Sequence, residues 1–163
     1  MDCFYVSLTT SGQVIDLLKE LVTRYPGSEI YQLAGSYDIL LKVSAEDMRD
    51  LNKKLNPILS SMEFNVLECV FHPVLSQKLL KCDGITSAFL FLKTEFALKE
   101  TIGEVLSSLL NNEAKEIDIV SGYFDFVVEL YKSIPGDVVK ILDDIDRVPG
   151  VLRTITMFVL RTR

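Results

Sequence analysis

The segments "LAGSYDILLKV" (33–43) and "VSGYFDFVVEL" (120–130) each place a glycine, one variable residue, an aromatic residue and an aspartate between two strand-like apolar stretches. Glycine adopts positive φ without a steric penalty, and a tight turn between paired strands needs that conformation. Each segment therefore predicts a β-hairpin. The same hairpin twice in one chain of 163 residues indicates an internal repeat.

The flanking sequences support this repeat. "CFYVSLTT" (3–10) resembles "AFLFLKTE" (88–95), and "ILSSMEFNVLECVFHPVL" (58–75) aligns with "ILDDIDRVPGVLRTITMFVL" (141–160) across a two-residue gap. Both hairpins lie between these matches. We therefore predict a first repeat over residues 1–75, a linker over 76–85 and a second repeat over 86–163.

Hydrophobic periodicity predicts the same order of elements in both repeats. Alternating, β-branched or aromatic stretches predict strands at 4–9, 29–34, 37–44, 65–71, 88–93, 115–120, 124–131 and 151–160. Apolar residues at helical spacing predict helices at about 14–25, 48–62, 97–111 and 135–147. Ser44 is the expected N-cap of the second helix.

Each repeat is thus a βαββαβ unit, the ferredoxin-like order, and the fold class is α+β. In such a unit both helices cover one face of a four-stranded antiparallel sheet. Alternation then turns Tyr5 and Ser7 away from the helices, with Leu40, Phe71 and Phe89 at equivalent positions. Because a face this apolar needs a cover, we expect the two sheets to pack face to face with the helices outside, as in dimeric α/β-barrels.

The composition of the chain argues against several functional classes. The net charge is −6 and the chain has no long basic cluster, so direct binding to nucleic acid is not expected. No apolar run approaches the roughly 20 residues that span a bilayer, and the N-terminus lacks a signal-peptide pattern. The three cysteines are widely spaced, which is typical of reduced thiols in a cytoplasmic protein.

The whole chain resembles two tandem copies of the effector-binding (RAM) domain of the Lrp/AsnC family. The resemblance rests on the strand–helix–strand start, the Gly-x-aromatic-Asp hairpin and a closing strand of the form Gly-Val-x-x-Thr-x-Thr, present as "GVLRTIT" at 150–156. Members usually carry an N-terminal helix-turn-helix. This chain shows none before its first strand, so the resemblance implies sensing and assembly without direct DNA contact.

The resemblance also implies a ligand site near the hairpin, commonly for an amino acid. In the second repeat it falls on Gly122, Tyr123, Phe124, Asp125, Thr154 and Thr156. Backbone N–H groups at the glycine turn would hold a carboxylate, Asp125 an ammonium, and the two threonine hydroxyls would fix orientation. The weaker counterpart in the first repeat is Gly35, Ser36, Tyr37 and Asp38, because Cys69 and Phe71 replace the threonines.

The same residues can also have purely structural roles. The hairpin aspartates can cap backbone donors, and the threonines can be strand formers on a half-buried face. Asp143, Asp144 and Asp146 are expected to be a solvated helix end rather than a metal site. His72, before Pro73, is expected to be a structural residue at a strand end, and Cys82 to be unreactive.

We therefore expect a non-catalytic module that senses an amino acid or similar metabolite and self-associates, with no catalytic residues, metal or cofactor. One alternative is an assembly partner of DNA-binding Lrp/AsnC proteins with a vestigial site. The other is an enzyme of the dimeric α/β-barrel type, which would need a buried base or a haem ligand. No nucleophile elbow, P-loop, Rossmann fingerprint or zinc spacing occurs in the chain.

Overall fold

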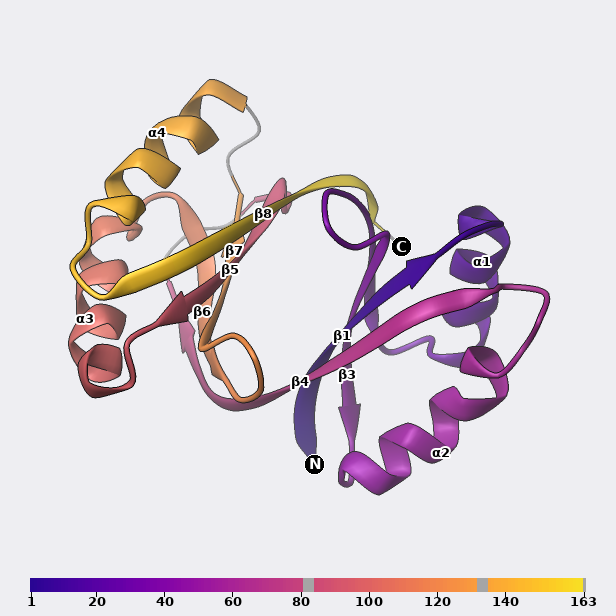
Figure 1. The fold of residues 1–163 in the computed structure, drawn as a ribbon. Helices are drawn as coiled ribbons and strands as arrows, with labels where there is room; N and C mark the ends of the chain where they lie inside the picture. The colour runs from indigo at the N-terminus through magenta and orange to yellow at the C-terminus, as the bar shows by residue number, and fades with distance from the viewer. Residues whose placement is uncertain (81–83, 132–134, 163) are drawn as a thin grey trace. The chain divides into compact units, whose positions relative to one another are not determined.

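The computed structural model describes residues 1–80, 84–131 and 135–162. The chain divides into two compact units (Figure 1). Unit 1 comprises Met1–Val74 and Val159–Arg163, and unit 2 comprises Leu75–Phe158.

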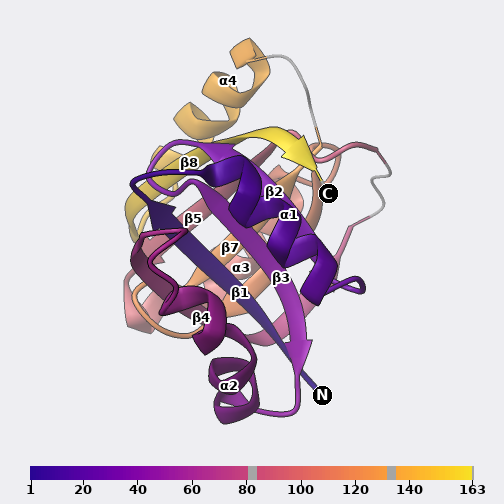
Figure 2. The same cartoon turned by 90° about the vertical axis from the view of Figure 1, so that its right-hand side faces the viewer.

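Unit 1 contains an antiparallel sheet with both helices on one face. Its elements are β1 (Asp2–Thr10), α1 (Val14–Arg24), β2 (Glu29–Ala34), β3 (Ile39–Ala45), α2 (Met48–Leu59) and β4 (Val66–Leu79), which continues past the unit boundary. β1 pairs with β3 and β4, and β3 pairs with β2, which gives the order β4-β1-β3-β2. Figure 2 shows α1 and α2 over this sheet. Their buried leucines pack on the β1 side chains Phe4, Val6 and Leu8.

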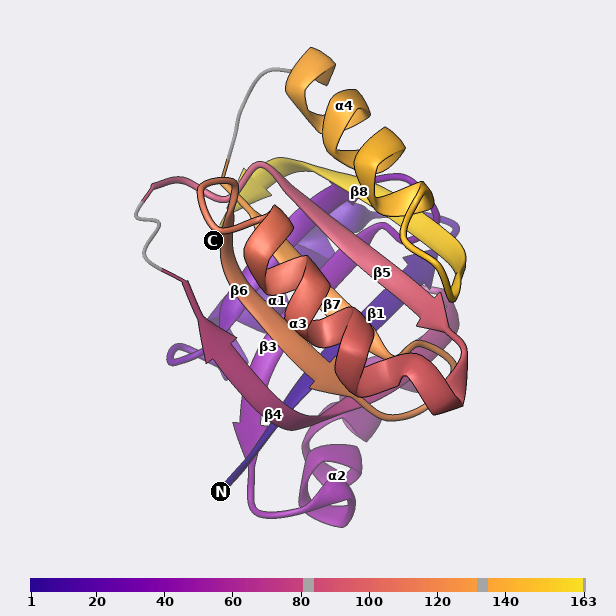
Figure 3. The same cartoon turned by 90° about the vertical axis from the view of Figure 1, so that its left-hand side faces the viewer.

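Unit 2 repeats this order. Its elements are β5 (Ala88–Thr94), a 3₁₀ turn η1 (Phe96–Leu98), α3 (Lys99–Leu109), β6 (Ala114–Val120), β7 (Phe126–Leu130), α4 (Pro135–Asp146) and β8 (Val151–Thr162). The strand order is β8-β5-β7-β6. Figure 3 shows α3 and α4 on one side of it, and the core includes Leu90, Leu92, Ile102 and Leu106.

The predicted α+β class, the antiparallel sheets and the order of elements are confirmed. The face-to-face packing of the two sheets, the derivation from two family domains and the domain boundaries stay predictions.

Strand β4 is longer than its sequence predicts. The expected strand ends at Phe71, whereas β4 continues through His72 and Pro73 to Leu79. Proline has no N–H to donate, so it normally argues against a central strand position. Pro73 nevertheless pairs with Phe4 of β1, so the missing donor does not end the strand. His72 therefore lies inside a strand, and the predicted strand-end placement is wrong.

Two other local predictions are also corrected. Phe71 pairs with Val6 and packs against the helix-facing core, so it does not lie on the second face. The N-cap of α2 is Asp47, whose side chain accepts a hydrogen bond from the Asp50 N–H at 2.7 Å, and Ser44 remains in β3. Asp and Ser are both good N-caps, so propensity alone could not choose between them.

Gly150 precedes β8 with φ +93°, and a Cβ at this position would lie 2.8 Å from Leu98 Cδ1 and 3.0 Å from Ile102 Cδ1. Left-handed backbone and overpacking each cost about 1–3 kcal/mol. We predict that Gly150→Ala lowers the free energy of unfolding by about 2–4 kcal/mol in urea titrations. Gly12→Ala, with no atom within 4 Å of the added Cβ, is the control and should be close to neutral. Equal effects of the two substitutions would contradict this packing.

Candidate functional site

The two hairpin aspartates make the same contacts in their units. Asp38 accepts a hydrogen bond from the Thr10 N–H, and Asp125 accepts one from the Thr94 N–H, both at 2.8 Å. Their own backbone N–H groups bond the carbonyls of Leu8 and Leu92. Each aspartate therefore ties its hairpin to the end of the first strand of its unit. The preceding glycines, Gly35 and Gly122, have φ of 146° and 110°, as the turn prediction requires.

The hairpin of unit 2 is surrounded by positive charge. Lys93 Nζ and Lys99 Nζ lie 3.7 and 3.6 Å from the Asp125 carboxylate. Arg153 donates to the Tyr123 hydroxyl at 3.4 Å. Because Asp125 already holds two ammonium groups and a backbone donor, it is partnered within the chain. Its predicted role toward a ligand ammonium, like the ligand role of Tyr123, stays a prediction.

The remaining predicted ligand residues occupy several environments. Phe124 is buried and meets Phe91 edge-on, while Tyr123 is 55% exposed. Thr154 and Thr156 pair with Leu92 and Leu90, on the helix-facing side of the sheet. Strand β5 lies between them and β7, so the structure does not place these threonines against the hairpin. In unit 1, Tyr37 is buried, and Gly35, Ser36 and Asp38 form its turn.

A different group of side chains forms the strongest candidate site. The register pairs Tyr5 of β1 with His72 of β4 and with Lys42 of β3, and it pairs Lys42 with Glu29 of β2. Directly paired residues point to the same side of an antiparallel sheet. His72, Tyr5, Lys42 and Glu29 therefore form one row across all four strands, on the face away from α1 and α2. We call these four residues the polar row.

Neighbouring contacts hold the polar row in position. The Ser7 hydroxyl and His72 Nε2 are hydrogen-bonded at 3.2 Å. The Lys42 ammonium lies 5.5 Å from the centre of the Tyr5 ring, a cation–π distance. At the other end of the row, the Tyr31 hydroxyl donates to the Glu29 carboxylate. The row thus carries an imidazole, a phenol, an ammonium and a carboxylate, which are the groups that general acid–base catalysis uses.

Burial sets the protonation state of the histidine. His72, Tyr5 and Ser7 are buried, Lys42 is half-buried and Glu29 is exposed. Burial lowers the pKa of His72 to about 4, because the charged imidazolium is disfavoured away from water. At neutral pH His72 is therefore an uncharged imidazole and a proton acceptor. With this low pKa it is a weak base near neutral pH, but it is available as a hydrogen-bond acceptor and as a proton relay.

Unit 2 lacks this chemistry at the equivalent positions. There the corresponding row is Met157, Phe89, Glu129 and Glu116. Methionine and phenylalanine stand where unit 1 has histidine and tyrosine, so no imidazole or phenol is available. The predicted ligand site of the second repeat stays a prediction, and the row with an imidazole, a phenol and an ammonium lies in unit 1.

The sequence carried a signal for this row. Tyr5 and Ser7 follow directly from the alternation of the first strand. His72 was missed because Pro73 argued for a strand end, although "VFHPVLSQKL" keeps strand-like character beyond it. The sequence does not predict that Lys42 and Glu29 belong to the polar row, because only the strand register determines which residues are cross-strand neighbours.

Other sequence predictions concern metals, cysteines and membranes. Asp143 and Asp146 are exposed at the end of α4 and Asp144 is half-buried, consistent with a solvated helix end. Within residues 1–80, 84–131 and 135–162, no group of three or more His, Cys, Asp or Glu side chains could hold a metal ion. Cys82 lies outside the described residues. No helix among those described is long and apolar enough to cross a membrane.

Comparison with known proteins places the chain in a family. The profile of the Lrp/AsnC ligand binding domain matches residues 3–84, about half of the chain. The chain belongs to the Lrp/AsnC ligand-binding domain family. The matched segment contains the whole polar row. No curated protein matches this sequence.

Solved structures share the fold at low sequence identity. The siroheme decarboxylase NirDL, solved with an iron-uroporphyrin III analogue, is similar with a TM-score of 0.72 and 8% identity, over 99% of this chain and 72% of that one. Chlorite dismutase from Candidatus Nitrospira defluvii is similar with a TM-score of 0.61 and 12% identity, over 98% of this chain and 91% of that one. These likenesses show the fold.

They also correct the functional prediction. The expectation of a non-catalytic sensing and oligomerisation module, and of no enzyme activity, is wrong, because siroheme decarboxylase and chlorite dismutase are enzymes built on this fold. Family membership supports the coarser expectation of small-molecule binding, whereas an amino-acid ligand and a role in transcription stay predictions.

The depressed pKa of His72 predicts a dependence of stability on pH. The unfolded chain binds a proton near pH 6.5 and the folded chain only near pH 4, so stability is complete above 6.5 and is lost as the pH falls toward 4. The loss should reach about 3 kcal/mol. Urea titrations at several pH values should show this slope in wild type and a smaller one in His72→Gln. Parallel pH profiles for the two proteins would show that His72 is not the titrating group.

Proposed function

We propose that this chain is an enzyme of the dimeric α/β-barrel type and that the polar row of unit 1 is its reactive site. The proposal rests on the composition of the polar row. It brings a buried neutral imidazole, a phenol and an ammonium together on one sheet face within the Lrp/AsnC segment. The matching positions of unit 2 have no such set.

The reaction that this set suits is decarboxylation of a tetrapyrrole carboxylate. Three features support it: the Lrp/AsnC match, the likeness to siroheme decarboxylase over 99% of the chain, and the chemistry of the row. In a decarboxylation the C–C bond to the carboxylate breaks, the electron pair stays on the carbon, CO2 leaves and the carbon takes up a proton. The site therefore needs a group to hold the carboxylate and a group to deliver a proton.

The row supplies both. The Lys42 ammonium is the carboxylate-binding group, since charge-assisted hydrogen bonds to carboxylates are among the strongest in proteins. The Tyr5 hydroxyl, with its ring beneath that ammonium, is the proton donor. His72 is a neutral imidazole next to Tyr5 and two strands away from Lys42. It is positioned to relay a proton from solvent to the Tyr5 phenolate, because it can accept a proton at one ring nitrogen and release the one on the other. The Tyr31–Glu29 hydrogen bond fixes the exposed end of the row.

Half-burial of Lys42 strengthens the ion pair that its ammonium would form with a substrate carboxylate. An ion pair that is partly shielded from water is worth more than an exposed one. The loss of water around the bound carboxylate favours cleavage, because hydration stabilises the charged carboxylate more than neutral CO2. Self-association of the chain stays a prediction and is measurable by light scattering.

The test is turnover of siroheme by the purified chain, with products identified by absorption spectroscopy and mass spectrometry as loss of CO2. Tyr5→Phe removes one oxygen from the row and should lower the rate at least about a hundredfold, the usual contribution of a general acid. Lys42→Gln should weaken substrate binding. Tyr131→Phe makes the same chemical change away from the row and should retain the wild-type rate.

Two results would contradict the proposal. The first is the absence of decarboxylated product from folded wild-type protein supplied with siroheme. The second is an equal rate for wild type and Tyr5→Phe, which would place the chemistry outside the polar row.

A further inference from the structure

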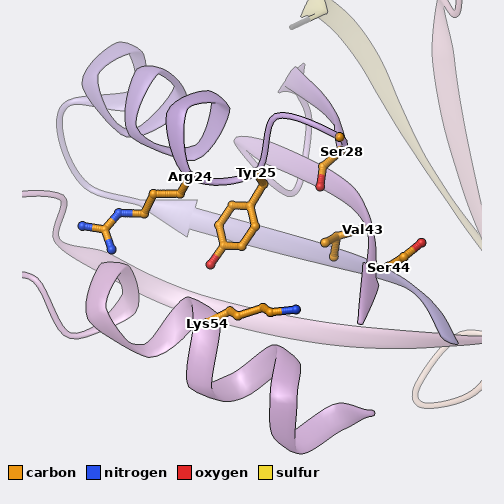
Figure 4. Close-up of a pocket in the computed structure, with 7 residues that line it drawn as sticks. Arg24, Tyr25, Ser28, Val43, Ser44 and Lys54 are labelled. Carbon is orange, nitrogen blue, oxygen red and sulfur yellow. The ribbon is translucent and has the colours of Figure 1, made fainter. Parts of the chain in front are cut away.

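Unit 1 contains a cavity that the polar row does not use. It lies between the C-terminal end of α1, the loop that leads into β2, the end of β3 and α2 (Figure 4). Its volume is about 520 Å³, within the range of small-molecule sites. Its lining residues are Arg24, Tyr25, Gly27, Ser28, Val43, Ser44 and Lys54.

The lining is cationic and rich in hydrogen-bond donors. Arg24 and Lys54 contribute two positive charges, and no acidic residue belongs to the lining. Figure 4 shows the Tyr25 ring between these two side chains, whose head groups are directed to opposite sides of it. Three hydroxyl groups, those of Tyr25, Ser28 and Ser44, complete the donor set. The pocket is thus rich in hydrogen-bond donors, although each cation has a carboxylate partner on its own helix.

Arg24 and Lys54 each have N–H donors that their ion pairs do not use. Arg24 pairs with Glu20 on α1, and Lys54 Nζ lies 2.7 Å from the Asp50 carboxylate on α2. These i,i+4 pairs orient the side chains along their own helices. A guanidinium has five N–H donors and an ammonium has three, and the two side chains are 46% and 47% exposed. Each can therefore donate to a ligand without breaking its pair.

Tyr25 adds a neutral donor and an aromatic wall. Burial raises the pKa of its phenol above the ordinary value. The hydroxyl therefore stays protonated and can donate to an anion. The C-terminal end of α1 brings a partial negative charge of about half a unit, and the Glu20 and Asp50 carboxylates partner the two cations. An anion would therefore be held by directional hydrogen bonds rather than by a net positive charge.

Unit 2 offers an internal comparison. Its cavity at the corresponding place, between the end of α3 and α4, measures about 150 Å³. That cavity is lined by Glu113, Asp137 and Asp144 with Lys140, in addition to Leu109, Leu110 and Ile141. The cavity at this place in the fold is therefore smaller in unit 2 and is lined mainly by acidic residues. Folding therefore does not require the cationic lining of unit 1.

We propose that the unit 1 cavity binds a small organic anion, with its phosphate or carboxylate group at the Lys54 ammonium and a flat apolar part against Tyr25. The two head groups share the same recognition chemistry, namely a charge-assisted hydrogen bond from Lys54 and single bonds from the serine hydroxyls. This site is separate from the polar row, which lies on the opposite face of the unit 1 sheet from α1 and α2. It does not depend on the proposed reaction.

The test is titration of the full chain, labelled with ¹⁵N, with phenyl phosphate, benzoate and inorganic phosphate, monitored by amide chemical shifts. Saturable shifts at Ser28 and Ser44 are expected, with phenyl phosphate or benzoate binding more tightly than inorganic phosphate because of the Tyr25 ring. The tighter of the two organic probes identifies the preferred head group. Lys54→Gln should weaken binding about tenfold, the effect of losing one charge-assisted hydrogen bond.

Lys53→Gln is the matched control, because it removes the same charge from the next residue of α2 without touching the lining. It should change the affinity less than about twofold, the size of a long-range charge effect. The proposal is overturned if no probe saturates the Ser28 and Ser44 shifts. It is also overturned if Lys53→Gln weakens binding as much as Lys54→Gln, or if the shifts centre on Lys140 of the unit 2 cavity. Thermal melting of each variant confirms that it is folded.

Discussion

The antiparallel register of β1 between β3 and β4 is the constraint on which the candidate site depends. It sends Phe4, Val6 and Leu8 to the helices and Tyr5 to the other face, next to Lys42 and His72. A slip by one residue would exchange the two faces completely. The hydrophobic side chains under α1 and α2 prevent such a slip, because it would place Tyr5 and Ser7 in the helix-facing core. The packing that stabilises unit 1 therefore also aligns its reactive groups.

The two units show how one fold can carry different chemistry. Asp38 and Asp125 tie their hairpins to the same backbone position with the same bond length, so this contact belongs to the fold. The second faces of the sheets are different. His72, Tyr5 and Lys42 in unit 1 correspond to Met157, Phe89 and Glu129 in unit 2. The cavities beside the helices differ in the same way, cationic in unit 1 and mainly acidic in unit 2.

Much of the fold could be predicted from sequence, since alternation and helical spacing identify elements without tertiary information. The hairpin glycines and the order of strands and helices are clear examples. The site could not be predicted to the same degree. Pro73 concealed the continuation of β4, and the partners of Tyr5 lie 37 and 67 residues away, so only the register brings them together. The resemblance to Lrp/AsnC effector domains predicts a ligand site at the hairpin, whereas the histidine lies on the sheet face away from α1 and α2.

The proposed function requires a tetrapyrrole carboxylate to bind at the polar row of unit 1. A crystal structure of the chain with iron-uroporphyrin III would test this most directly. We expect one carboxylate of the tetrapyrrole within hydrogen-bond distance of Lys42 Nζ, with the Tyr5 hydroxyl close to the carbon that bears it. A bound tetrapyrrole that contacts neither Lys42 nor Tyr5 would show that the polar row is not the binding site.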